Sequence, residues 1–112
     1  LGTINVLNGE IQNGSFKSVN NFELKNIKSE NKMKCSLLIR PQNISFIRRS
    51  DSDQAFKGKI EGKEFLGNII RYQVLLNDHL ITIDNVHQGK EKIYSKNDNI
   101  EFFINPEVSQ II

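Results

Sequence analysis

The sequence predicts an all-β protein built mostly of short antiparallel strands. Apolar residues occur in short runs or alternate with polar ones, and helical periodicity is almost absent. β-Branched and aromatic residues are frequent within these runs, and turn-forming pairs such as Asn-Gly separate them. Many short strands joined by tight turns are typical of sandwiches and small barrels.

The first half of the chain predicts short strands separated by turns and polar loops. Two Asn-Gly pairs, Asn8-Gly9 and Asn13-Gly14, predict tight turns because both residue types tolerate positive φ. The predicted elements that follow are a short strand at Phe22 to Leu24, a loop at Lys25 to Lys34, a buried strand at Cys35 to Ile39, one 3₁₀ turn at Pro41 to Asn43, a strand at Ile44 to Arg48 and a polar loop at Arg49 to Gln54.

The second half carries the clearest strand pattern. Phe56, Gly58 and Ile60 alternate with charged residues, which places them on one face of a strand. Gly62 is expected to bend or bulge this strand, as a strongly curved barrel requires. Three further strands are predicted at Ile69 to Leu76, Leu80 to Ile83 and Ile100 to Ile104, with a turn at Asn77-Asp78 and a polar stretch at His87 to Asn99. The expected fold is therefore an OB-fold-like small β barrel or a pair of such barrels.

Length and composition indicate one domain that needs no covalent staple. The chain has 112 residues, a net charge of +2 and a single cysteine, Cys35, which lies in an apolar run and is predicted to be a buried, inert thiol. The near balance of charges demands neither a nucleic-acid nor a membrane partner, and no apolar run approaches the roughly 20 residues of a membrane span.

Catalytic and metal-binding patterns are weak. The segment Gly58 to Glu64 is one residue shorter than a phosphate-binding loop and ends in Glu, so we expect no ATP hydrolysis by this chain and no cofactor bound to it. His79 and His87 have no second ligand at a suitable spacing and are predicted to be exposed. Glu61 and Glu64 are three apart on a strand and are expected on opposite faces.

Binding of single-stranded nucleic acid is an alternative function. Small barrels bind single strands with aromatic platforms and a basic groove. In this chain, aromatic and basic residues are interleaved: Phe46, Phe56, Phe65 and Tyr72 with Arg48, Arg49, Lys57, Lys59, Lys63 and Arg71. The competing interpretation is that the aromatic side chains belong to the core and the cations to a solvated face.

Three segments, in order along the chain, resemble the TOBE (transport-associated OB) domain of ABC importer ATPases. Leu1 to Gly9 resembles the junction with the ATPase domain, where the family tends to have Gly, then Asn-x-Leu, then Gly. Leu38 to Ile44, which contains Arg40-Pro41-Gln42, resembles the family's Arg-Pro-Glu motif. Gly58 to Ile60, then Phe65-Leu66-Gly67, resembles its Gly-x-Val and Phe-x-Gly pattern.

Two positions depart from the family's pattern. Gln42 stands where the family usually has Glu, which puts any charge-dependent role there in doubt. The segment Ser95 to Asp98 lacks the usual Gly near the last hairpin, although Asn97 can adopt positive φ and so preserve the turn.

The resemblance implies that residues 1–112 are one regulatory domain, cut from a longer chain, with residues 1–9 at the junction to a missing ATPase domain. ATP and Mg²⁺ would bind in that missing domain. The implied partners are this ATPase domain, a second copy of the chain and, indirectly, membrane permease subunits. The implied location is the cytoplasmic face of the cell membrane, and the transported solute would be ferric iron, a polyamine, maltose or a similar solute. A domain that senses an oxyanion or another small solute is a further alternative.

In that family the accessory domains meet across a two-fold axis, which requires a self-complementary, partly apolar patch. We place this patch at Arg40, Pro41, Gln42, Phe65, Leu66 and Gly67, where apolar residues lie beside chain-bending ones. The alternative is that Phe65 and Leu66 simply complete the core.

Overall fold

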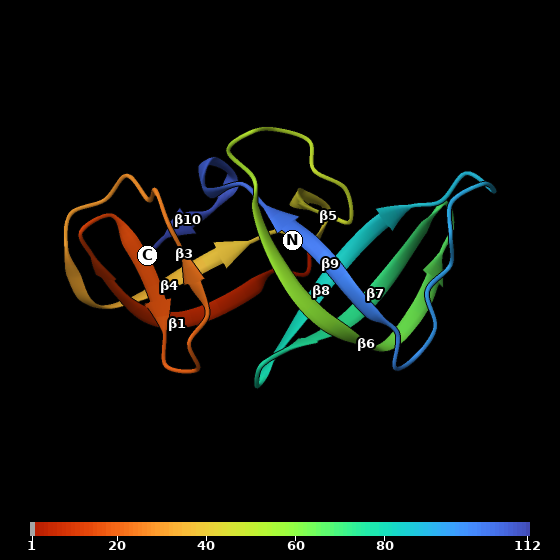
Figure 1. The fold of residues 1–112 in the computed structure, drawn as a ribbon, viewed down its shortest axis with the longest axis horizontal. Helices are drawn as coiled ribbons and strands as arrows, with labels where there is room; N and C mark the ends of the chain where they lie inside the picture. The colour runs from red at the N-terminus through yellow and green to blue at the C-terminus, as the bar shows by residue number, and fades with distance from the viewer. Residues whose placement is uncertain (1) are drawn as a thin grey trace.

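A computed structural model describes residues 2–112 as two five-stranded antiparallel sheets that lie side by side along the long axis of the molecule (Figure 1). The first sheet has the order β10-β4-β1-β2-β3, and the second has the order β5-β9-β6-β7-β8. The chain enters the first sheet, passes through the whole second sheet and returns to the first with its last strand (Figure 1). The predicted all-β fold of short antiparallel strands is confirmed.

The first sheet is formed by both ends of the chain. Its strands are β1 (Asn5–Gln12), β2 (Ser15–Ser18), β3 (Glu23–Leu24), β4 (Lys32–Ile39) and β10 (Gln110–Ile111). A 3₁₀ turn, η1 (Pro41–Asn43), leads out of this sheet, and a second one, η2 (Pro106–Val108), leads back into it.

The second sheet is a nearly closed barrel of the expected OB-like kind. Its strands are β5 (Ile44–Ser45), β6 (Gln54–Leu66), β7 (Ile69–Leu76), β8 (His79–Val86) and β9 (Asn99–Ile104). Both η1 and β5 pack against β8, the strand at the opposite edge of the sheet, and so narrow the opening between the two edges.

The predicted strands at Cys35–Ile39, Phe56–Ile60, Ile69–Leu76, Leu80–Ile83 and Ile100–Ile104 are all present, four of them within longer strands. The turns at Asn13, Asn77 and Asn97 are also confirmed, because each of these residues has a positive φ. The predicted loop at Lys25 to Lys34 is shorter than expected, since β4 already begins at Lys32.

The prediction of a turn at Asn8-Gly9 is wrong, because β1 runs straight through this pair. Gly9 instead lies where the register between β1 and β4 shifts and the backbone of β2 comes close. A Cβ atom on Gly9 would be 2.2 Å from the carbonyl oxygen of Lys17 and 2.8 Å from the Phe16 ring. Close backbone approach, rather than turn geometry, therefore requires glycine at this position.

The predicted strand at Ile44 to Arg48 ends early, at Ser45. The Ser45 hydroxyl accepts a hydrogen bond from the Ile47 amide (3.1 Å), and the carboxylate of buried Asp53 accepts from the amides of Arg49 (2.7 Å) and Ser50 (3.1 Å). These side chains take backbone donors that a continued strand would have paired with its neighbour.

The bulge expected near Gly62 is present, as a register shift between Ile60 and Gly62 in the β6–β7 pair. It also makes one prediction wrong, because Glu61 and Glu64 do not lie on opposite faces. Glu61 lies beside Leu75 on the outer face of the sheet. Glu64 is aligned across the strands with Arg71, which lies on the same outer face as Leu75. The extra residue in the bulge cancels the alternation on which the prediction depended.

A single hydrophobic core runs through both sheets. Four phenylalanine rings form a chain across it, with centroid separations of 6.3 Å for Phe16–Phe22, 4.9 Å for Phe22–Phe56 and 5.7 Å for Phe56–Phe102. Phe22 belongs to the β2–β3 connection and Phe56 to β6, so their stacked pair joins the two sheets. Within residues 2–112 we find no helix long and apolar enough to cross a membrane.

We predict that Gly9→Ala lowers the free energy of unfolding by at least about 2 kcal/mol, because the new methyl group meets rigid backbone. Urea denaturation followed by circular dichroism measures the change. Gly62→Ala is the matched control, since nothing lies within 4 Å of its Cβ position, and it is expected to change stability by less than about 0.5 kcal/mol. Equal effects of the two substitutions would contradict the close approach at Gly9.

Candidate functional site at the junction between the sheets

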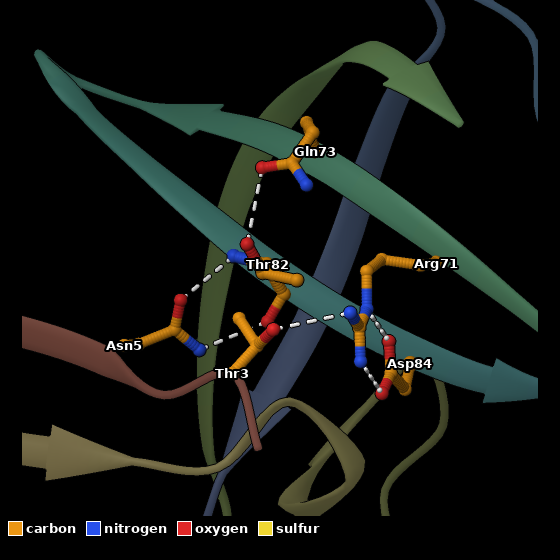
Figure 2. Close-up of polar contacts among 6 residues, drawn as sticks. All are labelled: Thr3, Asn5, Arg71, Gln73, Thr82 and Asp84. Atoms are coloured by element: carbon orange, nitrogen blue, oxygen red, sulfur yellow. Dashed lines mark hydrogen bonds and ion pairs between the residues drawn. The ribbon is translucent and has the colours of Figure 1, made fainter. Parts of the chain in front are cut away.

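The side chain of Asn5 joins the first sheet to the edge of the second (Figure 2). Its amide nitrogen donates to the Thr82 carbonyl oxygen (2.9 Å), and its carbonyl oxygen accepts from the Thr82 amide (2.8 Å). The backbone of Asn5 pairs with Ile39 in the first sheet, while Thr82 lies on β8. The Asn5 carboxamide thus takes the place that a neighbouring strand would occupy, and the contact is buried.

A second carboxamide, on a strand of the second sheet, makes the same kind of contact with backbone next to the first sheet. Gln54, the first residue of β6, donates from its amide nitrogen to the Lys25 carbonyl oxygen (2.7 Å) and accepts from the Lys25 amide (2.8 Å). Lys25 follows β3 of the first sheet directly. We call the Asn5–Thr82 and Gln54–Lys25 contacts the two carboxamide clamps.

Further hydrogen bonds connect the turn after β2 with the β7–β8 hairpin. The Ser18 hydroxyl lies 2.9 Å from Nε2 of His79, and the Asn77 side chain donates to the Asn20 carbonyl oxygen at 3.0 Å. His79 was expected to be exposed, but it is partly buried in this contact. His87 is also partly buried, with Nε2 3.1 Å from the Glu91 carbonyl oxygen.

An ion pair lies beside the first clamp (Figure 2). Arg71 on β7 donates to both carboxylate oxygens of Asp84 on β8, at 2.8 and 2.9 Å, and to the Thr3 hydroxyl at 3.1 Å. The hydrogen bond to Asp84 raises the pKa of the Arg71 guanidinium further above its ordinary value. The Arg71 guanidinium therefore stays charged at neutral pH, and its hydrogen bond to Thr3 connects this residue to the second sheet.

Arg40-Pro41-Gln42 lies where the barrel closes. Pro41 is buried at the start of η1, which packs against β8, whereas the side chains of Arg40 and Gln42 are exposed. The proline fixes φ for the turn and accepts a hydrogen bond from the Ile44 amide. Pro41 is therefore a structural residue, and only its two neighbours are available to a partner.

Phe65-Leu66-Gly67 lies at the β6–β7 turn, at the end of the second sheet away from the first (Figure 1). Phe65 is 61% exposed and Leu66 39%, so the alternative that they complete the core is wrong. Gly67 has a φ of +65°, which the tight turn requires. Leu66 aligns across the sheet with Ile69 and Val86 and so extends an apolar row onto β8. The two parts of the predicted patch lie in different places, η1 near the middle of the molecule and the turn at one end (Figure 1).

Most of the aromatic side chains considered for nucleic-acid binding belong to the core. Tyr72 is fully buried, and Phe46 and Phe56 pack against the core; only Phe65 of this set is exposed. Burial raises the pKa of the Tyr72 hydroxyl, which accepts a hydrogen bond from the Tyr94 amide at 3.1 Å. The segment Gly58 to Glu64 forms part of β6 rather than a phosphate-binding loop.

The thiol of Cys35 lies in the first sheet, 3.6 Å from the Gly9 carbonyl oxygen, and is buried as predicted. Burial raises its pKa above the ordinary value, an effect that nearby Lys32 opposes and Glu10 reinforces. Among residues 2–112, no three His, Cys, Asp or Glu side chains are close enough together to hold a metal ion.

The fold and the junction define this chain as an all-β protein of two joined sheets, the second of them an OB-like barrel. Comparison with known proteins names no family: no family model matches the chain. A search of curated proteins also finds no significant match. The likeness to TOBE domains therefore rests on the three segments described above.

We predict that Asn5→Ala lowers the free energy of unfolding by about 2 to 4 kcal/mol, because it leaves both backbone groups of Thr82 buried without partners. Chemical denaturation measures this loss. Asn8→Ala is the control on the same strand as Asn5. It removes only an exposed hydrogen bond that Asn8 accepts from Ser36 and is expected to cost less than about 1 kcal/mol. If both variants are equally stable, the Asn5 clamp does not hold the sheets together.

We also predict that the free energy of unfolding falls as the pH rises above about 8.5. The Cys35 thiol ionises in the unfolded chain near that pH but keeps its proton in the folded state, where its pKa is raised. Ionisation therefore stabilises the unfolded state relative to the folded state over this range. Urea titrations between pH 7 and 9.5 should show a steeper fall for the wild-type chain than for Cys35→Ala. Parallel pH profiles would contradict the raised pKa.

Proposed function

We propose that this chain is a TOBE-type regulatory domain of an ABC importer ATPase. The observation that carries the proposal is where the family-like segments lie in the fold. Asn5 forms the clamp between the sheets, Arg40-Pro41-Gln42 lies where the barrel closes, and Phe65-Leu66-Gly67 forms an exposed turn. Segments that are far apart in sequence thus occupy the junction, the closure and the exposed end of one small all-β domain.

On this proposal the chain performs no chemistry itself. ATP and Mg²⁺ bind in a motor domain on the same polypeptide, and the role of the β domain is to support pairing and regulation during import of a solute such as ferric iron. The domain works on the cytoplasmic face of the membrane, beside permease subunits. Its contribution is a rigid scaffold with exposed apolar residues at one end.

We predict that the native gene product is larger than the 12.9 kDa of this chain and hydrolyses ATP, whereas the 112-residue chain alone binds no nucleotide. Intact-mass analysis of the native protein and calorimetric titration of the isolated chain with ATP test both statements. A native product of 12.9 kDa without ATPase activity would overturn the proposal.

Titration of the isolated chain with single-stranded oligonucleotides distinguishes this proposal from a nucleic-acid-binding function. A regulatory domain is expected to bind oligonucleotides weakly at most, and to lose them at physiological salt. Nanomolar binding that resists salt would instead support the nucleic-acid function. The same titration with oxyanions tests the solute-sensing alternative.

The exposed apolar residues at the β6–β7 turn predict that the chain self-associates. We expect a weak dimer at high protein concentration that dissociates on dilution, formed through the apolar row at Leu66 and Val86. Sedimentation should show that Leu66→Asp abolishes the dimer. Val19→Asp, at an 82% exposed residue in the turn after β2, is the control and should leave the dimer intact. A monomer up to millimolar concentration would contradict the predicted patch.

A further inference from the structure

Thr3 and Asn5 are hydrogen-bonded to the second sheet, although Asn5 is a strand residue of the first. Asn5 is a strand residue of the first sheet, paired with Ile39, yet its side chain bonds to Thr82 of the second sheet. Two residues earlier, the Thr3 hydroxyl accepts from Arg71, which is itself held by Asp84 on β8. Thr3 and Asn5 therefore lie where the two sheets meet (Figure 2).

The strands contacted at this point lead to the exposed end of the barrel. Thr82 and Asp84 lie on β8, four and two residues before Val86. Val86 pairs with Ile69, and Ile69 pairs with Leu66 on β6. Strand pairing therefore connects Thr82 on β8 with the apolar row at Leu66.

Other contacts between the sheets do not involve the entering segment. These contacts are the Gln54–Lys25 clamp, the stacked Phe22–Phe56 rings and the Ser18–His79 and Asn77–Asn20 hydrogen bonds. These contacts can therefore keep the sheets together and act as a pivot when the entering segment is pulled away.

We propose that residues 3–5 form a strap that couples the position of the domain preceding this chain to the relative orientation of the two sheets, and hence to the exposed apolar row. The partner of the strap is the motor domain, so this inference rests on the proposed function. Movement of the motor domain pulls Thr3 and Asn5 against β7 and β8, and the second sheet turns about the Gln54–Lys25 clamp. The strap thereby regulates pairing of the domains at Leu66.

The isolated chain tests whether the strap sets the orientation of the sheets. Spin labels on Lys17→Cys in β2 and Glu101→Cys in β9, in a Cys35→Ala background, report the distance between the sheets by pulsed electron resonance. We expect a narrow distribution that broadens about twofold in the Thr3→Ala/Asn5→Ala variant and not in Asn8→Ala. Asn5→Asp keeps the acceptor for the Thr82 amide and repeats the test if the double variant does not fold. An unchanged distribution in folded strap variants would overturn the inference.

The full-length protein tests the coupling itself. With an active motor domain, a non-hydrolysable ATP analogue should shift the distance between the labels, and the strap substitutions should abolish the shift while ATP hydrolysis persists. A distance that ignores nucleotide in an active ATPase would overturn the coupling. If the native protein has no ATPase activity, the proposed function and the coupling both fail, whereas the orienting role of the strap is decided by the isolated chain alone.

Discussion

The structure depends on the way that two small sheets are joined, because no strand of the first sheet pairs with β8, the edge strand of the second sheet at the contact. Side-chain carboxamides replace the missing strand pairing, with Asn5 bonded to Thr82 and Gln54 to Lys25. Each clamp satisfies one backbone donor and one backbone acceptor. The Thr82 groups are buried and would otherwise have no partner, whereas the Gln54–Lys25 contact is exposed. The phenylalanine chain through Phe22 and Phe56 supplies the apolar part of the same junction.

Periodicity made the second sheet predictable from sequence. The alternation at Phe56 to Ile60 and the paired runs flanking Asn77 depend on local residue order, and the structure places strands at these positions. The bulge at Gly62 was also foreseen, but its effect on Glu61 and Glu64 was not, because one inserted residue reverses every assignment of faces beyond it.

The junction could not be predicted from sequence in the same way. Asn5 and Gln54 act through partners 77 and 29 residues away, and no local pattern specifies such pairings. One signal was available for Asn5, since Asn is depleted in strands and its presence in one suggests a use for its side chain. Gly9 was misassigned for a related reason: Asn-Gly predicts a turn from local preference, while the neighbouring strand at Lys17 decides the outcome.

The proposed regulatory function rests on where the family-like segments lie on this joined scaffold. The chain enters at the junction, and the exposed apolar turn lies at the far end of the second sheet, so a rigid barrel separates the two places (Figure 1). On the proposed function, this arrangement lets the domain transmit a change of position between the two places. The family-like segments at Arg40-Pro41-Gln42 and Phe65-Leu66-Gly67 support the same interpretation.

The central claim is that the junction makes both sheets one cooperative unit. Native-state hydrogen exchange tests it most directly, by comparing the slowest amides of β1 and β4 with those of β6 and β7. We predict that both sets exchange through the same global unfolding, with equal free energies and equal dependence on denaturant. Exchange of the first sheet at a clearly lower free energy, while the barrel stays protected, would contradict the account.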